Sequence, residues 1–143
     1  MVGRRQTSVS LFLDSSILFT AVNSPTGGSS KLFALKDIRL LTSTYVLTET
    51  EMNVRKKLEE YHLERFFRLV EKLEIISSLP ERKELTKAKK VIVEKDAIIL
   101  SQVKLSRSKF LITFDKKHFL TESVEKYLKP KKALTTKMFF DWW

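Results

Sequence analysis

Near the N-terminus, residues 8–22 read SVSLFLDSSILFTAV. An apolar run rich in β-prone side chains ends at Leu13, and Asp14 and two serines separate it from a second apolar run. A short strand, a polar turn and a helix explain this order most simply. The pattern therefore predicts a strand from Ser8 to Leu13 and places Asp14 directly after it.

The rest of the chain continues this alternation of short strands and helices. Further strands are expected over residues 38–41, near 75–76, over 110–114 and near 133–134. Helices are expected from a cap at Ser29 or Ser30 through Lys36, from a cap at 42–44 to about 58, and over 62–73, 81–90, 95–106 and 121–128. Strands that alternate with helices through short connections predict one α/β domain over residues 1–143, with a mainly parallel sheet.

Composition excludes several kinds of chemistry. The chain has no cysteine, so disulfides, thiolate zinc sites and thiol nucleophiles are excluded. Its two histidines, His62 and His118, are far apart in sequence. We therefore expect no histidine-built metal site and interpret His118 as a surface residue. No apolar run approaches the roughly 20 residues needed to span a bilayer, so we expect a cytoplasmic protein without a membrane partner.

The chain is strongly basic. Lys and Arg number 27 against 17 Asp and Glu, which gives a formal net charge of +10 over 143 residues. Clustered basic side chains attract phosphates and release counterions on binding. Nucleic acid is therefore the expected partner, although net charge also serves solubility.

Several carboxylates occupy positions that suit a binding site. Asp14 and Asp115 each follow a predicted strand, and ligands of parallel sheets bind beyond the carboxyl ends of the strands. Asp96 begins an apolar helix, where it could bind a cation or cap the helix N-terminus. Glu49 and Glu51 share one helix, and periodicity does not choose between them. Converging carboxylates would suit a hard cation such as Mg²⁺.

Four segments carry the most specific pattern: LFLDSSIL at 11–18, STYVLTE at 43–49, KDAIIL at 95–100 and LITFDKK at 111–117. In order and spacing they resemble the PIN-domain nuclease family over nearly the whole chain. The resemblance implies a three-layer α/β/α sandwich with a mainly parallel central sheet. It also assigns the family's glutamate to Glu49 rather than Glu51.

The resemblance further implies a metal-dependent endoribonuclease that uses Mg²⁺ or Mn²⁺. The implied metal ligands and catalytic carboxylates are Asp14, Glu49, Asp96 and Asp115. Thr113 fits the family's hydroxyl position before the last aspartate. Ser16 stands where the family often has Asn, and its hydroxyl can still orient Asp14 or a water molecule.

The compact chain is similar to VapC-type toxins, which implies a cognate antitoxin and a homodimer. A stand-alone RNA-processing nuclease and a non-catalytic RNA-binding or scaffold domain remain alternatives. Lys95, Lys116 and Lys117 flank the expected ligands and either contact phosphates or are ordinary solvated lysines. The aromatic C-terminal tail at about 137–143 is expected to pack on the core or form an interface rather than stack on bases.

Overall fold

The computed structural model describes residues 9–143 and contains a parallel five-stranded sheet. The strands are β1 (Val9–Leu13), β2 (Ile38–Ser43), β3 (Glu74–Ile76), β4 (Phe110–Ile112) and β5 (Lys132–Leu134). They lie in the order β3-β2-β1-β4-β5, and every neighbouring pair is parallel. The chain therefore builds outward from β1 to β3 and then places β4 on the other side of β1. Such a reversal opens a crevice at the carboxyl ends of the two strands that flank it.

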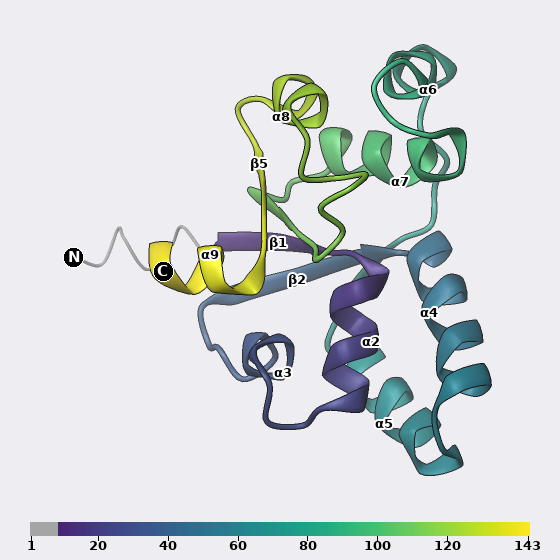
Figure 1. Ribbon diagram of the computed structural model, residues 1–143, viewed down its shortest axis with the longest axis vertical. Helices are drawn as coiled ribbons and strands as arrows, with labels where there is room; N and C mark the ends of the chain where they lie inside the picture. The colour runs from purple at the N-terminus through teal and green to yellow at the C-terminus, as the bar shows by residue number, and fades with distance from the viewer. Residues whose placement is uncertain (1–8) are drawn as a thin grey trace.

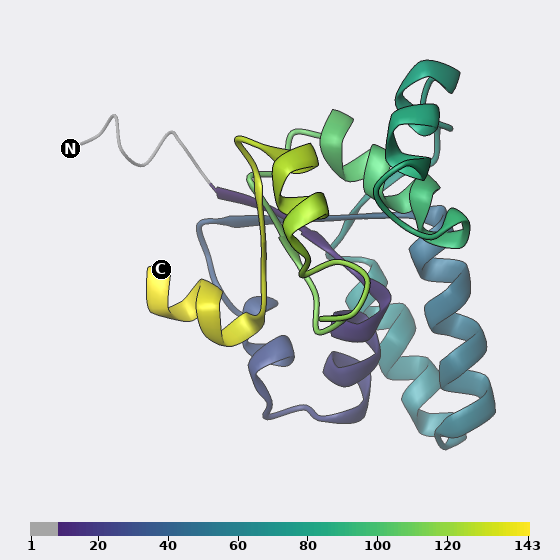
Figure 2. The same cartoon turned by 45° about the horizontal axis from the view of Figure 1, so that its top comes forward.

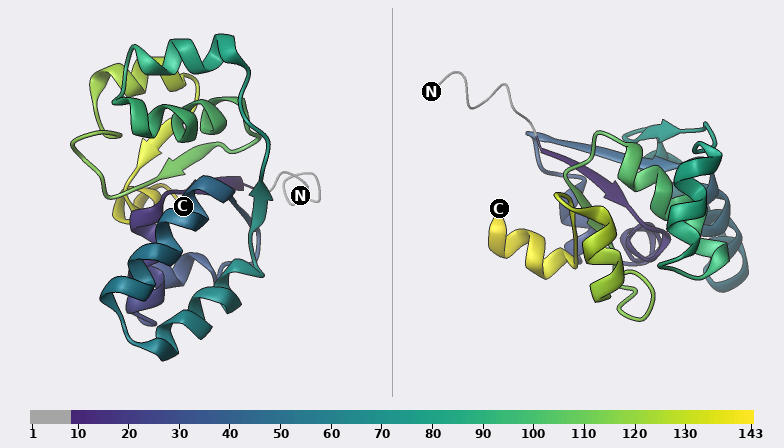
Figure 3. Two further views of the ribbon diagram at one scale, coloured as in Figure 1. Left: turned by 90° about the vertical axis from the view of Figure 1, so that its right-hand side faces the viewer. Right: turned by 90° about the horizontal axis from the view of Figure 1, so that it is seen from above.

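Helices cover both faces of this sheet (Figures 1 and 3). One layer contains α2 (Ser15–Asn23), α3 (Gly28–Leu32), α4 (Thr44–Lys57) and α5 (Glu60–Val70). The opposite layer contains α6 (Arg82–Lys89), α7 (Glu94–Leu105) and α8 (Glu122–Leu128). The predicted three-layer α/β/α sandwich is thus confirmed. Within residues 9–143, no helix has the length and apolar character required to cross a membrane.

The central strand shows why the first apolar run is continuous. Leu11, Phe12 and Leu13 are fully buried, because helices cover both faces of the strand. A strand buried on both faces reads as an unbroken apolar run instead of an alternating one. The predicted first strand is confirmed from Val9 onward, while Ser8 lies outside the described residues. This burial fixes the position of the polar residues that follow β1.

The prediction that Ser29 or Ser30 caps a helix is wrong. The helix α3 begins at Gly28 and ends at Leu32, so Ser29 and Ser30 lie inside it. Their hydroxyls make tertiary contacts instead: Ser30 Oγ donates to the Ala21 carbonyl at 2.9 Å. These hydroxyls fix α3 against the end of α2. They do not satisfy the N-terminus of their own helix.

The C-terminal aromatic tail forms a helix that the sequence pattern did not predict. This helix, α9 (Thr136–Trp142), lies beside α3 and on the far side of the molecule from α4 (Figure 2). Phe139 is fully buried, which confirms that the tail packs on the core. The ring of Trp142 meets Phe110 edge-on at 4.8 Å between centroids and remains 49% exposed. That the exposed part of α9 forms an interface with another protein stays a prediction.

Candidate metal centre

The fold brings four acidic side chains from distant parts of the sequence to one edge of the sheet. Asp14 follows β1, and Asp115 follows β4, which is paired with β1. Glu49 lies early in α4, which begins where β2 ends, and Asp96 is the third residue of α7. The charges of Asp14 and Asp96 raise the pKa of Glu49 beyond the effect of burial, and Asp115 acts likewise on Asp14. These four residues therefore form one acidic cluster.

Asp14 is the most deeply placed carboxylate of the cluster, with 4% of its surface exposed. Thr113 Oγ1 donates to Asp14 Oδ2 at 2.8 Å, and Ser16 Oγ donates to the same oxygen at 3.2 Å. Burial raises the pKa of Asp14, these hydrogen bonds oppose the shift, and the nearby Asp115 charge adds to it. The side chain is held firmly, but its ionised form is disfavoured when no cation is near.

The two hydroxyls also connect β1 to the loop that follows β4. The fully buried Thr113 Oγ1 accepts from the Asp115 backbone amide at 3.0 Å. Ser16 Oγ accepts from the Phe114 backbone amide at 3.0 Å. Each hydroxyl therefore donates to Asp14 and accepts from the loop, so both positions singled out in the sequence lie in the cluster.

Asp96 does not cap its helix, so the capping interpretation is wrong. The N-cap of α7 is Val93, and no side chain makes a capping hydrogen bond there. Within residues 9–143, the buried Oδ2 atom of Asp96 has no hydrogen-bond partner. Burial raises the pKa of Asp96, while the charges of Lys95 and His118 oppose that shift. A buried acceptor without a donor is costly, and a bound cation would account for it.

His118 belongs to this cluster, contrary to its interpretation as a surface residue. Its backbone amide donates to Asp115 Oδ1 at 3.0 Å, and its Nδ1 lies 3.0 Å from Asp115 Oδ2. Burial would raise the pKa of Asp115, but the hydrogen bonds and charge of His118 outweigh it and lower that pKa. One donor atom each from Asp96, Asp115 and His118 lie within 4.8 Å of one another. The three-residue spacing from Asp115 was the available sequence signal.

The structure separates Glu49 from Glu51. Glu49 is exposed as a residue, but partial burial of its carboxylate, followed by the charges of Asp14 and Asp96, raises its pKa. Glu51 instead pairs with Arg55, one turn further along α4, at 2.9 Å. Side chains two positions apart on an α-helix point in directions that differ by about 200°. Glu49 therefore faces the cluster, whereas Glu51 turns away from it.

A lysine lies close to the cluster. Lys95 is exposed, and its charge opposes the rise in the pKa values of Glu49 and Asp96 and adds to the lowering of the pKa of Asp115. Lys116 and Lys117 are exposed in the loop after β4. Lys95 is thus placed to meet an anion that approaches the carboxylates.

The donor atoms of the cluster fit a divalent cation. Carboxylate oxygens are the ligands that Mg²⁺ and Mn²⁺ prefer, and four acidic side chains converge here. The unpartnered Oδ2 of Asp96 provides a buried oxygen with a free coordination site. We therefore regard the cluster as a candidate metal centre.

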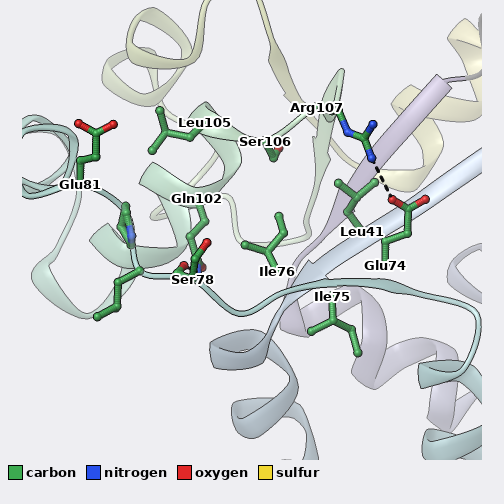
Figure 4. Close-up of a pocket in the computed structure, with 12 residues that line it drawn as sticks. Leu41, Glu74, Ile75, Ile76, Ser78, Glu81, Gln102, Leu105, Ser106 and Arg107 are labelled. Atoms are coloured by element: carbon green, nitrogen blue, oxygen red, sulfur yellow. Dashed lines mark hydrogen bonds and ion pairs between the residues drawn. The ribbon is translucent and has the colours of Figure 1, made fainter.

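A separate cavity of about 490 Å³ lies at the outer edge of β3, next to the C-terminal half of α7 (Figure 4). Leu41, Ile76 and Gln102 contribute to its wall. Glu74 and Arg107 approach to 3.5 Å beside it, as the dashed line shows. The four carboxylates of the cluster do not line this cavity, so volume is a poor guide to the chemistry here. The converging acids and the unpartnered oxygen locate the site better.

The sequence model of the PIN domain matches residues 11–122. The chain belongs to the PIN-domain nuclease family. The match spans all four acidic positions and the two hydroxyl positions of the PIN-domain cluster. No curated protein sequence matches the chain.

Solved structures support the PIN fold at low sequence identity. VapC20 of Mycobacterium tuberculosis, a sarcin-ricin loop cleaving toxin, is 17% identical with a TM-score of 0.57, covering 75% of this chain and 91% of that chain. VapBC2 of Rickettsia felis, bound to promoter DNA, is 18% identical with a TM-score of 0.64, covering 89% and 98%. DNA-bound VapBC of Salmonella typhimurium is 15% identical with a TM-score of 0.60, covering 90% and 98%. These neighbours share the fold of the present PIN domain.

Proposed function

We propose that this PIN domain is an endoribonuclease that depends on Mg²⁺ or Mn²⁺ bound at the acidic cluster. The observation that carries the proposal is the buried Oδ2 atom of Asp96, which has no partner within residues 9–143. Asp14 and Glu49 have raised pKa values from burial first and neighbouring acids next. A cation would relieve both the missing contact and the repulsion among the acids.

In this proposal, Asp14, Glu49, Asp96 and Asp115 would hold the cation. When bound, the cation supplies Lewis acidity that polarises a phosphoryl oxygen and lowers the pKa of water. The hydroxyls of Thr113 and Ser16 keep Asp14 oriented by donating to its Oδ2 atom. Lys95 binds a phosphate oxygen and so positions the phosphodiester beside the carboxylates.

RNA is the proposed substrate. The net charge of +10 favours a polyanion, and the exposed Lys95 lies beside the acids. The structural neighbour VapC20 is described as cleaving the sarcin-ricin loop, which is consistent with an RNA substrate for the present chain. A non-catalytic RNA-binding domain would have no need for four acids near a polyanion.

We further propose that the protein acts as the toxin of a toxin–antitoxin pair in the cytoplasm. The structural neighbours include the DNA-bound VapBC structures of Rickettsia felis and Salmonella typhimurium, which supports a partner protein of the antitoxin kind for the present chain. A small reading frame beside the gene whose product co-purifies with the protein would support this role. Its absence favours a stand-alone RNA-processing nuclease. Light scattering of the purified protein tests the expected homodimer.

Cleavage of RNA by the purified protein in Mn²⁺ or Mg²⁺ tests the chemistry. We expect EDTA to stop cleavage and Asp96→Asn to lower its rate at least about 100-fold, since loss of a metal ligand removes several kcal/mol of stabilisation. Glu49→Gln should also lower the rate. Glu51→Gln is the matched control, because Glu51 lies two residues away on the same helix and pairs with Arg55.

Three results would contradict the proposal or a part of it. Cleavage that survives both EDTA and Asp96→Asn would exclude the metal–carboxylate mechanism. RNA binding without cleavage in either metal would favour the non-catalytic alternative. Equal losses in the Glu49 and Glu51 variants would show that α4 matters through stability instead of through the cluster.

A further inference from the structure

We propose that His118 supplies a nitrogen ligand to the cation bound by Asp96 and Asp115, and that it shifts the preference of the site from Mg²⁺ toward Mn²⁺. The inference rests on the proposed function, since it requires a cation at the acidic cluster. It adds a donor beyond the four carboxylates.

The distances among the three side chains are close to those of ligands on one ion. Ligands about 2.1 Å from an octahedral cation lie roughly 3.0 Å apart when adjacent and 4.2 Å apart when opposite. His118 Nδ1 lies 3.0 Å from Asp115 Oδ2. Donor atoms of Asp96, Asp115 and His118 all lie within 4.8 Å of one another. Small side-chain rotations therefore suffice to place all three on one cation.

The backbone holds His118 in this position. Its amide donates to Asp115 Oδ1 at 3.0 Å, and the next amide, that of Phe119, donates to the Asp115 carbonyl at 3.0 Å. The side chain of Phe119 is buried in the core. The turn after β4 is thus anchored on both sides of the imidazole. Its direction toward the cluster is built into the fold.

A hydrogen bond from His118 to Asp115 is the alternative to ligation, and the 3.0 Å contact suits either role. A cation on the buried Oδ2 of Asp96 would satisfy that atom in both cases. What favours ligation is the closeness of one donor atom from each of the three side chains.

The nitrogen donor has a consequence for metal choice. Mg²⁺ prefers an all-oxygen environment, whereas imidazole suits transition-metal ions. A site with one imidazole among carboxylates should bind Mn²⁺ more tightly than Mg²⁺. Removing the imidazole should weaken Mn²⁺ binding at least about tenfold and Mg²⁺ binding less than about threefold.

Pulsed electron paramagnetic resonance of the Mn²⁺-loaded full chain tests the ligand directly, because it detects nitrogen bound to the metal. The chain has two histidines, so His62→Gln is the matched control for His118→Gln. His62 lies in α5 and accepts the Glu59 amide at 3.1 Å. We expect histidine nitrogen coupling in the wild type and in His62→Gln, and its loss in His118→Gln. Calorimetric titration of each variant with Mn²⁺ and with Mg²⁺ measures the change in preference.

The possible failures are distinguishable. Bound Mn²⁺ without nitrogen coupling, or coupling that survives His118→Gln, overturns the inference and leaves the proposed function intact. An unchanged ratio of Mn²⁺ to Mg²⁺ affinity in His118→Gln overturns the claim about preference. Failure of the wild type to bind Mn²⁺ at all overturns both the inference and the metal dependence of the proposed function.

Discussion

Asp14 and Asp96 are carboxylates of the same cluster, yet the chain surrounds them differently. Two hydroxyls donate to Asp14 Oδ2, whereas Asp96 Oδ2 is buried without a partner in residues 9–143. We name the first group the strand side; it comprises Asp14, Ser16 and Thr113. We name the second group the helix side; it comprises Asp96, Asp115 and His118.

The difference teaches what each side contributes. The strand side is complete by itself, because its hydrogen bonds join β1 to the loop after β4. The helix side is incomplete, because a buried acceptor at the start of α7 lacks a donor. The strand side is held in place before a ligand binds, whereas the helix side has an acceptor that a ligand would satisfy. This combination suits a binding site. Mutations of the two hydroxyls on the strand side should therefore affect stability first, and mutations on the helix side should affect ligand binding first.

The largest expected effect is the loss of metal-induced stability in Asp96→Asn. Mn²⁺ at 100 times its Kd should raise the free energy of unfolding of the wild type by about 2.7 kcal/mol. The variant should lose most of this gain, because the helix side loses its charged oxygen. Urea unfolding with and without Mn²⁺ measures it, with Glu51→Gln as the control. A variant that keeps the full gain would show that the cation binds elsewhere.

The next effect tests the strand side through Thr113→Val, which removes a hydroxyl and keeps the shape. The free energy of unfolding should fall by about 1–3 kcal/mol, because Asp14 loses a donor and the Asp115 amide loses its acceptor. Chemical denaturation in EDTA measures the change. Thr113→Ser should retain most of the stability. If Thr113→Val were as stable as wild type, the hydrogen bonds of the Thr113 hydroxyl would not stabilise the strand side.

A smaller effect appears in the pH dependence of stability without metal. Burial raises the folded-state pKa of Asp96 above its ordinary value of 3.8. Its contribution to stability is therefore fully present below that ordinary value and is lost as pH rises through the folded pKa. Asp96→Asn lacks this titration, so the variant should gain stability relative to wild type as pH rises. Unfolding in EDTA across acidic to neutral pH tests the sign, and a relative loss would contradict it.

The smallest effect is expected for Glu51→Gln, which lies outside both sides of the cluster. Its ion pair with Arg55 is exposed and spans one helical turn. Such pairs contribute about 0.3–0.5 kcal/mol, so the free energy of unfolding should change by no more than that. Thermal unfolding and RNA cleavage are the measurements. A large loss of cleavage would mean that Glu51 and not Glu49 serves the cluster.

Local sequence patterns predicted a helix or strand well where the interactions that define it lie within that helix or strand. The strand after residue 37 and the cap at Ser43 were readable because apolar runs and hydroxyl caps act over a few residues. The cap of α3 was predicted wrongly because Ser29 and Ser30 hydrogen-bond outside their own helix. The C-terminal helix was not predicted although Thr135 caps it, because its nearly continuous run of bulky apolar residues shows no helical periodicity.

The site was only partly readable for a similar reason. Position after a strand was enough to single out Asp14 and Asp115, since parallel strands end at one edge. Periodicity did not separate Glu49 from Glu51, because the direction of the cluster relative to α4 is a tertiary property. The family resemblance supplied that choice, and the structure turns Glu49 toward the other acids.

By itself, the sequence determined the local elements, the basic charge and the types of donor atom that could meet a cation. Only the tertiary structure decided that Asp96 does not cap α7 and lies instead within reach of Asp115 and His118. The physical reason is that these relations depend on distances between α7 and the turn after β4. Those distances are set by how both segments pack on the central strand, and no spacing along the chain encodes them directly.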